Sequence, residues 1–191
     1  MRKEIPALRE FSFFLKTDKQ LSRVEKNQMH NLLVRMYPSF RNLFDKHGYY
    51  SMVKPQMNFL IKNDDILVGT GKFLWRKIEI KSGGIKLFAF GMVVANEYQN
   101  RGLGTALVKL CIKEAKERGG EILYASTSNL KVKRMLDKVK FQKLNVPIFY
   151  RDAITGRIKR QKTSVYIFEL TKGLIKRINT LPKIYIGVGP I

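Results

Sequence analysis

The run of residues from Leu87 to Arg118 constrains the fold more than any other part of the chain. It begins with an almost wholly apolar stretch, Leu87 to Val94, which predicts a central strand buried on both faces. Gly102 and Gly104 follow, and from there the apolar positions share one helical face: Leu103, Ala106, Leu107, Leu110 and Cys111. Glycine costs roughly 0.5 to 1 kcal/mol against alanine in regular structure, so two at a helix start indicate a task that side chains would obstruct.

A phosphate group is the ligand that best fits a glycine-bearing turn at the start of a helix. The first NH groups of a helix have no partner within it, and they stand at the positive end of the helix dipole. An anion approaches them closely where no Cβ stands in the way. Two nucleotide motifs do not fit. Nothing after Gly104 supplies the third glycine of a dinucleotide fingerprint, and Ile66 stands where a P-loop ending in Gly71 and Lys72 needs its first glycine.

Length and composition favour one globular domain. With 191 residues, 45% apolar and 27% charged, the chain predicts a single domain over residues 1–191, with a core at about 7–170 and a C-terminal extension at 171–191. Its single cysteine, Cys111, excludes an internal disulfide and a cysteine-rich zinc site, and favours a reducing compartment. No signal-peptide pattern, membrane-length apolar run or cluster of acidic metal ligands is present, so we expect a cytoplasmic protein without a membrane span or metal.

The formal net charge of +22 arises from 37 Lys and Arg residues against 15 Asp and Glu. Such a field concentrates polyanions, among them nucleotides, nucleic acid, phospholipid headgroups and phosphorylated cofactors. The basic residues are scattered along the chain and are not interleaved with aromatic residues in one block, which argues against nucleic acid. A basic solvated surface without a specific anionic partner is the alternative interpretation.

The order of the expected elements predicts an α/β or α+β domain with a mixed sheet. In the first part of the chain, residues 9–17 are expected to form a strand. Thr17 and Gln20 have the spacing of a capping box, so a helix of about five turns is expected from there to the Tyr37-Pro38 pair. A shorter helical segment is expected to follow it.

The later elements are expected from turn signals and alternation. Residues 57–80 predict two strands around the polar turn at residues 63–65, and Gly83 and Gly84 mark the next turn. After the glycine junction and its helix, one more strand and one more amphipathic helix are expected. Residues 141–150 and 163–170 then predict a pair of strands joined through a basic connection. The sequence leaves open whether the C-terminal extension packs along the sheet or stands free.

Residues Gln99 to Gly104 match the acyl-CoA signature, which is Gln or Arg, two residues of any kind, Gly, any residue, then Gly or Ala. Together with the strand before, the helix and strand after, and the sequence SNLKVKRMLDKVKF, the chain resembles the GNAT superfamily of N-acetyltransferases from about Met57 to Leu170. That resemblance implies a mostly antiparallel sheet flanked by helices, with a splayed strand pair at the acyl-CoA cleft. The layout of the C-terminal strands is loosely similar to the aminoglycoside 2'-N-acetyltransferase branch.

The resemblance implies acetyl-CoA as the donor and assigns residues to it. The pantetheine arm is expected against the backbone of Met92, Val93 and Val94, and against Asn129, which matches the asparagine after the following strand. The pyrophosphate is expected on the NH groups that begin at Arg101. The full set of expected cofactor-binding residues is Met92, Val93, Val94, Gln99, Asn100, Arg101, Gly102, Leu103, Gly104, Thr105 and Asn129.

The catalytic residues depart from the family pattern. Many members carry a tyrosine in an Asn-x-x-Ala-x-x-Leu-Tyr pattern, where this chain has Leu136, and a glutamate on the motif strand, where it has Phe88 to Phe90. Acyl transfer to an amine uses a general base and a general acid within hydrogen-bond reach. The candidates that replace them are Tyr124, Ser126, Tyr150 and Glu169. Positioning alone, with water carrying the proton, is the alternative.

A basic connection follows Tyr150, with Arg151, Arg157, Lys159, Arg160 and Lys162. Beside an acceptor site it favours an acceptor that bears phosphate or carboxylate, because like charges repel a polycation; the alternative is a solvated hairpin tip. The predicted function is acetyl transfer from acetyl-CoA to a primary amine. Two other functions stay as alternatives: an acyl-CoA-binding protein without turnover, and a basic nucleic-acid-binding protein. The acceptor and the oligomeric state are left open.

Overall fold

The computed structural model describes residues 8–47, 53–80 and 83–189, and the chain divides into two compact units. Unit 1 comprises Met1–Phe73 and Gly91–Leu107, and unit 2 comprises Leu74–Phe90 and Val108–Ile191. Three elements contribute residues to both units: strands β3 (Ile66–Ile80) and β4 (Gly83–Val94) and helix α3 (Leu103–Glu117). The two units are described separately.

The sheet of unit 1 is built from antiparallel neighbours. Strand β1 (Phe11–Lys16) pairs with β2 (Met57–Asn63), and β2 pairs with the first half of β3. The expected polar turn between β2 and β3 is confirmed, with Asp64 at φ 51°, a conformation that Asp and Asn tolerate better than other side chains. β4 begins at Gly83, so the Gly83-Gly84 pair expected to form a turn lies within a strand.

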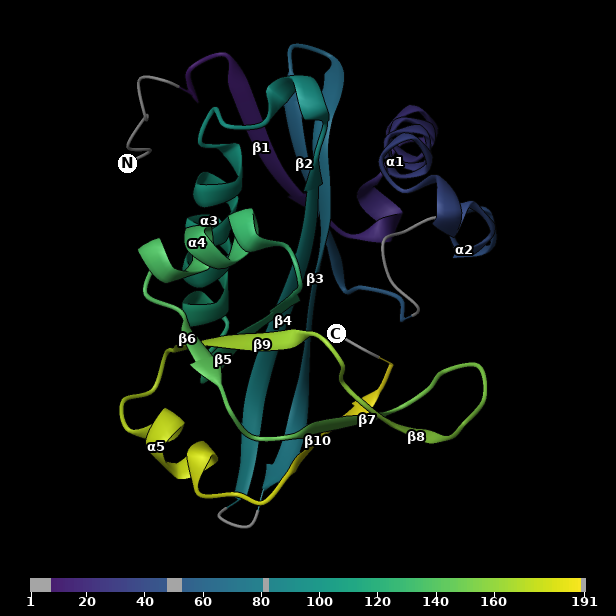
Figure 1. The fold of residues 1–191 in the computed structure, drawn as a ribbon. Coiled ribbons are helices and arrows are strands. Elements are labelled where there is room, and N and C mark those ends of the chain that lie inside the picture. Colours follow the sequence, from purple (N-terminus) through teal and green to yellow (C-terminus); the bar gives the residue numbers. More distant parts are fainter. Residues whose placement is uncertain (1–7, 48–52, 81–82, 190–191) are drawn as a thin grey trace. The chain divides into compact units, whose positions relative to one another are not determined.

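The helices of unit 1 begin later than the first capping signal predicts. The capping box of Thr17 and Gln20 exists, but it caps a short 3-10 turn, Asp18–Gln20. A second capping box, formed by Ser22 and Glu25, starts the main helix α1 (Arg23–Met36). Another 3-10 turn (Pro38–Phe40) and the expected short helix α2 (Arg41–His47) follow, and Figure 1 shows α1 and α2 side by side.

Among the described residues of unit 1, two apolar clusters hold the end of β4 and the start of α3. Beneath α1 and α2, the buried side chains of Leu33, Phe44 and Leu60 pack with Val93 of β4. In the second cluster, Leu103 of α3 packs with four other buried side chains: Leu8, Phe11, Ile61 and Val68. A Cβ at Gly71 of β3 would collide with the carbonyl oxygen of Gly91, so a glycine there permits the close approach of β3 and β4.

The larger sheet of unit 2 has β4, β5 (Ile122–Thr127), β9 (Ser164–Glu169) and β6 (Gln142–Leu144) as neighbours in that order. β4 and β5 run parallel, whereas β9 is antiparallel to both β5 and β6. Helix α4 (Leu130–Lys138) follows β5. The prediction of a mixed, mostly antiparallel sheet flanked by helices is therefore confirmed.

Residues 141–150 do not form the single strand that their sequence predicts. They divide into β6 and β7 (Ile148–Arg151), which belong to different sheets. Pro147 lies in the break, where a residue without an NH donor suits the end of a ladder. β7 pairs with β8 (Ile158–Arg160), a short strand within the basic connection, while β6 pairs with β9.

The C-terminal extension packs within unit 2. Helix α5 (Leu174–Asn179) is followed by β10 (Ile184–Val188), which lies parallel to β7 and completes a three-stranded sheet, visible in yellow beside β7 in Figure 1. The guanidinium of Arg76 donates to the carbonyl oxygens of Ile186 and Val188 at 2.6 and 2.8 Å. Leu174, Ile178 and Ile186 join the main core of the unit, so the extension is part of the fold; residues 190–191 lie outside the described range.

No helix in the described parts of the chain is long and apolar enough to cross a lipid bilayer.

Candidate functional site

The glycine junction of unit 1 is a loop with two residues in the left-handed region. After the 3-10 turn Asn96–Tyr98, Asn100 has φ 64° and Gly102 has φ 86°. A Cβ at Gly102 would meet nothing within 4 Å, so the space around it would admit a side chain. Glycine is favoured there because of its left-handed backbone conformation. We call residues Gln99–Thr105 the glycine cradle.

The start of α3 leaves main-chain donors unpaired. The first bond of the helix runs from the Ala106 NH to the Gly102 carbonyl at 3.0 Å. The NH groups of Leu103, Gly104 and Thr105 therefore precede the first donor that has an intrahelical acceptor. Gly104 and Thr105 are partly exposed. These groups form an electropositive end suited to a phosphate, as the sequence predicts.

The side chains of Gln99 and Arg101 hold the cradle in shape. The Gln99 amide nitrogen donates to the Val94 carbonyl and to the side-chain oxygen of Asn96, both at 3.0 Å. The Arg101 guanidinium donates to the Glu97 carbonyl and lies 5.1 Å from the centre of the Tyr98 ring. Gln99 thus ties the loop to the end of β4. Arg101 ties it to the preceding turn, and its guanidinium also lies 3.7 Å from Glu10 Oε1.

Met92, Val93 and Val94 lie at the end of β4. The ladder of β4 with β5 has three pairs and ends at Ala89 and Tyr124, so these residues lie beyond it, as a splayed strand pair predicts. Val93 is buried in a core cluster, whereas Met92 and Val94 are partly exposed. The chain leaves the strand through a bond from the Ala95 NH to the Val68 carbonyl at 2.9 Å.

Asn129 of unit 2 caps helix α4. Its side-chain oxygen accepts a hydrogen bond from the Lys131 NH at 2.9 Å, and its own NH donates to the Thr127 hydroxyl at 3.0 Å. The side chain is exposed, and its amide NH2 group remains available as a donor. Asn129 therefore orients the start of α4 while keeping one polar group for a ligand.

Three of the four candidate catalytic residues lie close together in unit 2. Tyr124 is 1% exposed in the main core, against which Tyr150 packs. The Tyr124 hydroxyl is buried and has no hydrogen-bond partner of acceptable geometry among the described residues. Burial raises the pKa of Tyr124 well above its ordinary value, the nearby Ser126 hydroxyl partly opposes this, and Tyr150 adds to it. Tyr124 is therefore protonated at neutral pH and suits a proton donor, not a base.

Glu169, the fourth candidate, is engaged elsewhere. Its Oε1 accepts a hydrogen bond from the Ile175 NH at 3.0 Å and so caps the start of α5. Leu136, Phe88 and Ala89 stand at positions where the family often carries its tyrosine and glutamate, and all three are fully buried. These three positions therefore carry apolar side chains and supply no acid or base.

Cys111 lies in the core and does not contribute to the site. Cys111 is fully buried, and burial raises the pKa of its thiol, so it is a core residue as predicted. Within residues 8–47, 53–80 and 83–189, no group of three or more His, Cys, Asp or Glu side chains is arranged to hold a metal ion.

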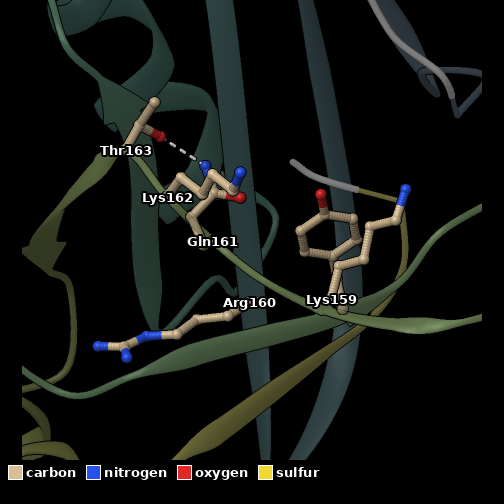
Figure 2. Close-up of a pocket in the computed structure, with 6 residues that line it drawn as sticks. Lys159, Arg160, Gln161, Lys162 and Thr163 are labelled. Atoms are coloured by element: carbon tan, nitrogen blue, oxygen red, sulfur yellow. Dashed lines mark hydrogen bonds between the residues drawn. The ribbon is translucent and has the colours of Figure 1, made fainter.

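A basic pocket lies beside Tyr150 in unit 2. It has a volume of about 650 Å³ and is lined by Tyr150 and residues 159–163 (Figure 2). Tyr150 and Lys159 are directly paired across β7 and β8. Figure 2 shows Lys159 and Arg160 extending to opposite sides of the segment, and Gln161 donating to the Thr163 hydroxyl. The basic connection thus lines a hollow next to a candidate catalytic residue.

Asp152 organises this region and was not predicted. One carboxylate oxygen accepts hydrogen bonds from the Ile154 NH, the Thr155 NH and the Thr155 hydroxyl, and the other lies 2.7 Å from Lys159 Nζ. The Lys159 ammonium and the NH donors hold the pKa of Asp152 well below its usual range. The sequence signal was the Asp-Ala-Ile-Thr-Gly run, which is typical of an Asp that folds back onto its own turn.

The chain matches one family in sequence. The model described as "Acetyltransferase (GNAT) family" matches residues 26–141, more than half of the chain. Among curated proteins, no significant sequence match is found.

Solved structures share the fold at low identity. The GNAT family N-acetyltransferase YhbS from Escherichia coli in complex with CoA is 10% identical, with a TM-score of 0.58 over 94% of this chain and 89% of that chain. A GNAT family acetyltransferase from Elizabethkingia anophelis with acetyl-CoA bound is 17% identical, with a TM-score of 0.53 over 85% of this chain and 99% of that chain. The ribosomal-protein-S18-alanine N-acetyltransferase from Escherichia coli is 16% identical, with a TM-score of 0.51 over 82% of this chain and 91% of that chain.

Proposed function

Because the chain belongs to the GNAT family of acetyltransferases, we propose that it transfers an acetyl group from acetyl-CoA directly to a primary amine. The observation that carries this proposal is the glycine cradle, with its left-handed Gly102 and the unpaired NH groups of Leu103, Gly104 and Thr105. Relatives of the same fold bind acetyl-CoA or CoA, which supports the same donor here.

The donor is proposed to bind through main-chain groups. The pyrophosphate accepts hydrogen bonds from the NH groups of Arg101 to Thr105, and Gln99 and Asn100 keep the loop in the shape that exposes them. The pantetheine arm is proposed to run along the backbone of Met92 to Val94. Asn129 is the polar contact that the resemblance to the family assigns to the same arm. No cationic side chain is required, because the helix start supplies the positive field.

The reaction moves one acyl group and one proton. The neutral amine nitrogen attacks the thioester carbonyl carbon, the carbon–sulfur bond breaks, and the amide bond forms. The nitrogen loses its proton to water, and the CoA thiolate takes up a proton as it leaves. Tyr124 is the proposed donor of that proton, because burial keeps its hydroxyl protonated, and Ser126 and Tyr150 are proposed to orient it.

Glu169 is the weakest of the four candidates. Its carboxylate is bonded to the Ile175 NH, so acting as a base would cost the cap of α5. Water therefore remains the proposed acceptor of the proton from the amine. The single buried cysteine suits a reducing compartment, and we propose the cytoplasm as the location.

An acceptor screen tests the proposal. The full chain is incubated with acetyl-CoA and a panel of primary amines, neutral, cationic and anionic, and free thiol release is followed together with the mass of the products. We expect thiol release that depends on at least one amine and yields the acetylated amine. Binding of acetyl-CoA without amine-dependent thiol release across the panel would instead indicate an acyl-CoA-binding protein without turnover.

A further inference from the structure

The basic pocket of unit 2 carries an inference that rests on the proposed function and deepens it. We propose that the pocket lined by Tyr150 and residues 159–163 binds a phosphate or carboxylate group of a small acceptor amine. The acceptor would then carry both the amine that is acetylated and an anionic group that fixes its orientation.

The charges that line the pocket have one sign. Lys159, Arg160 and Lys162 are its cations, and none of its lining residues is acidic. The carboxylate of Asp152 lies 2.7 Å from Lys159 Nζ and balances that cation. Among the described residues, neither Arg160 nor Lys162 has an acidic partner within 4 Å. Two of the three lining cations therefore have no acidic side chain of the described residues beside them.

The stretch of sequence around the pocket carries mostly charges of the same sign. From Val139 to Phe168 the sequence holds seven basic residues: Lys140, Lys143, Arg151, Arg157, Lys159, Arg160 and Lys162. Asp152 is the one acidic residue of that stretch. A second hollow of about 260 Å³, lined partly by Lys143 and Arg160, adjoins the first through shared residues 160–163. A concave surface with one sign of charge concentrates ligands of the opposite sign.

Hydrogen-bond donors accompany these charges. The Tyr150 side chain is partly exposed, and its hydroxyl has no hydrogen-bond partner among the described residues. Lys159 uses one of its three NH donors on Asp152, so two remain for a ligand. Phosphate and carboxylate oxygens accept several such bonds at once. The pocket volume of about 650 Å³ lies in the range that small-molecule sites occupy.

Binding is tested first, without any acetyl transfer. The nitrogen-15-labelled full chain is titrated with inorganic phosphate at constant ionic strength, with chloride as the control, and amide shifts are followed by NMR. We expect saturable shifts at residues 159–163. Shifts at Leu103 to Thr105 would report the glycine cradle separately, so failure of the donor site is distinguishable from failure of the pocket.

A matched pair of variants locates the binding. The Arg160→Gln/Lys162→Gln variant is expected to weaken phosphate binding at residues 159–163 by at least about fivefold, since charge-assisted hydrogen bonds are lost. The Lys176→Gln/Lys183→Gln variant removes the same charge from exposed positions of unit 2 and is expected to leave binding unchanged. Equal shifts with chloride, or equal weakening in both variants, would overturn the proposal.

Catalysis tests the class of acceptor. Amines that differ only by a phosphate or carboxylate, such as O-phosphoethanolamine and ethanolamine, are compared by CoA release. We expect the anionic member to have the lower KM, and Arg160→Gln/Lys162→Gln to erase that preference with little change in kcat. Acetylation of amines with no preference for an anionic member would overturn the acceptor class while leaving the proposed function intact. If no amine is acetylated, the phosphate titration alone decides the anion site.

A nucleic acid is the competing occupant. A short single-stranded oligonucleotide is added to the phosphate-bound protein at several salt concentrations. We expect no displacement of phosphate from residues 159–163 at moderate salt. Displacement by the oligonucleotide with a steep salt dependence would assign this surface to nucleic acid and overturn the small-acceptor proposal.

Discussion

The glycine cradle of unit 1 and the basic pocket of unit 2 are both proposed anion sites, yet they are built from different atoms. The cradle uses main-chain NH groups at the start of α3, exposed by a left-handed Gly102. The pocket uses the side chains of Lys159, Arg160 and Lys162, with the Tyr150 hydroxyl. A main-chain site is damaged by adding atoms, whereas a side-chain site is damaged by removing them.

Gly104→Asp should have the largest effect, because it adds a carboxylate where the pyrophosphate is proposed to lie. We expect the affinity for acetyl-CoA, measured by isothermal titration calorimetry, to fall at least about 1,000-fold, which is about 4 kcal/mol.

The control for this variant is Gly104→Ala, which adds a methyl group without charge at a helical position and still fits the Gly-or-Ala signature. It should keep its affinity within roughly threefold, since alanine suits a helix. Equal losses in the two variants would show that space and not charge governs the cradle.

Tyr124→Phe should have the next largest effect, on turnover and not on acetyl-CoA binding. Loss of the proposed proton donor is expected to lower kcat about 100-fold, at the lower end of general acid catalysis. Stability measured by urea unfolding should stay equal or rise by up to about 1 kcal/mol, because the hydroxyl is buried without a complete hydrogen bond. An unchanged kcat would remove Tyr124 from the mechanism.

Gly102→Ala sharpens the contrast between backbone and side chain. A Cβ at φ 86° meets no neighbour but strains the backbone by about 1 to 2 kcal/mol, which lowers Tm by roughly 2 to 8 °C and acetyl-CoA affinity by up to roughly 5- to 30-fold. Gly156→Ala, at φ 67° in the β7–β8 turn, is the matched control. It should lower Tm similarly and leave acetyl-CoA affinity unchanged; a loss of affinity there too would mean that strain acts globally.

Glu25→Gln should have the smallest effect, confined to stability and fading at acid pH. Burial opposes ionisation of Glu25, but hydrogen bonds from Lys16, the Ser22 NH and Lys62 outweigh it and lower the pKa to about 2. The pKa of an unfolded glutamate is about 4.3, so the unfolded chain binds the proton first as the pH falls. The stabilisation is present above about pH 5 and is lost as the pH falls towards 2.

Urea unfolding at about pH 6 and about pH 3 measures this contribution. The wild type should exceed Glu25→Gln by about 1 kcal/mol at the higher pH, after allowance for solvent screening, and by roughly half as much at the lower pH, which lies between the folded and unfolded pKa values. A constant difference between the two proteins across this range would contradict the role of the carboxylate.

The sequence predicted the fold best where the physics is local. The apolar run of β4, the Asn63–Asp65 turn and the periodicity of α3 each depend on neighbours in the chain, and all three are confirmed. The cradle was predictable for the same reason, because a main-chain site needs glycines at fixed spacing and so leaves a short pattern. Its assignment to acetyl-CoA came from the resemblance to a family.

The parts that the sequence could not give depend on distant partners. Nothing local indicates that β10 pairs with β7, or that residues 141–150 divide between two sheets at Pro147. The start of α1 was placed too early because two capping boxes follow one another. Side-chain sites suffer most: the role of Glu169 as a cap for α5 and the bond of Asp152 to Lys159 come from contacts that no spacing encodes.

The central claim is that main-chain NH groups of the cradle hold acetyl-CoA, and amide hydrogen exchange tests it most directly. Exchange is measured residue by residue with and without saturating acetyl-CoA. The account predicts that the amides of Leu103, Gly104 and Thr105 slow on the order of tenfold or more, because a bound pyrophosphate accepts their hydrogen bonds. Unchanged exchange at these three amides while acetyl-CoA is bound would contradict it.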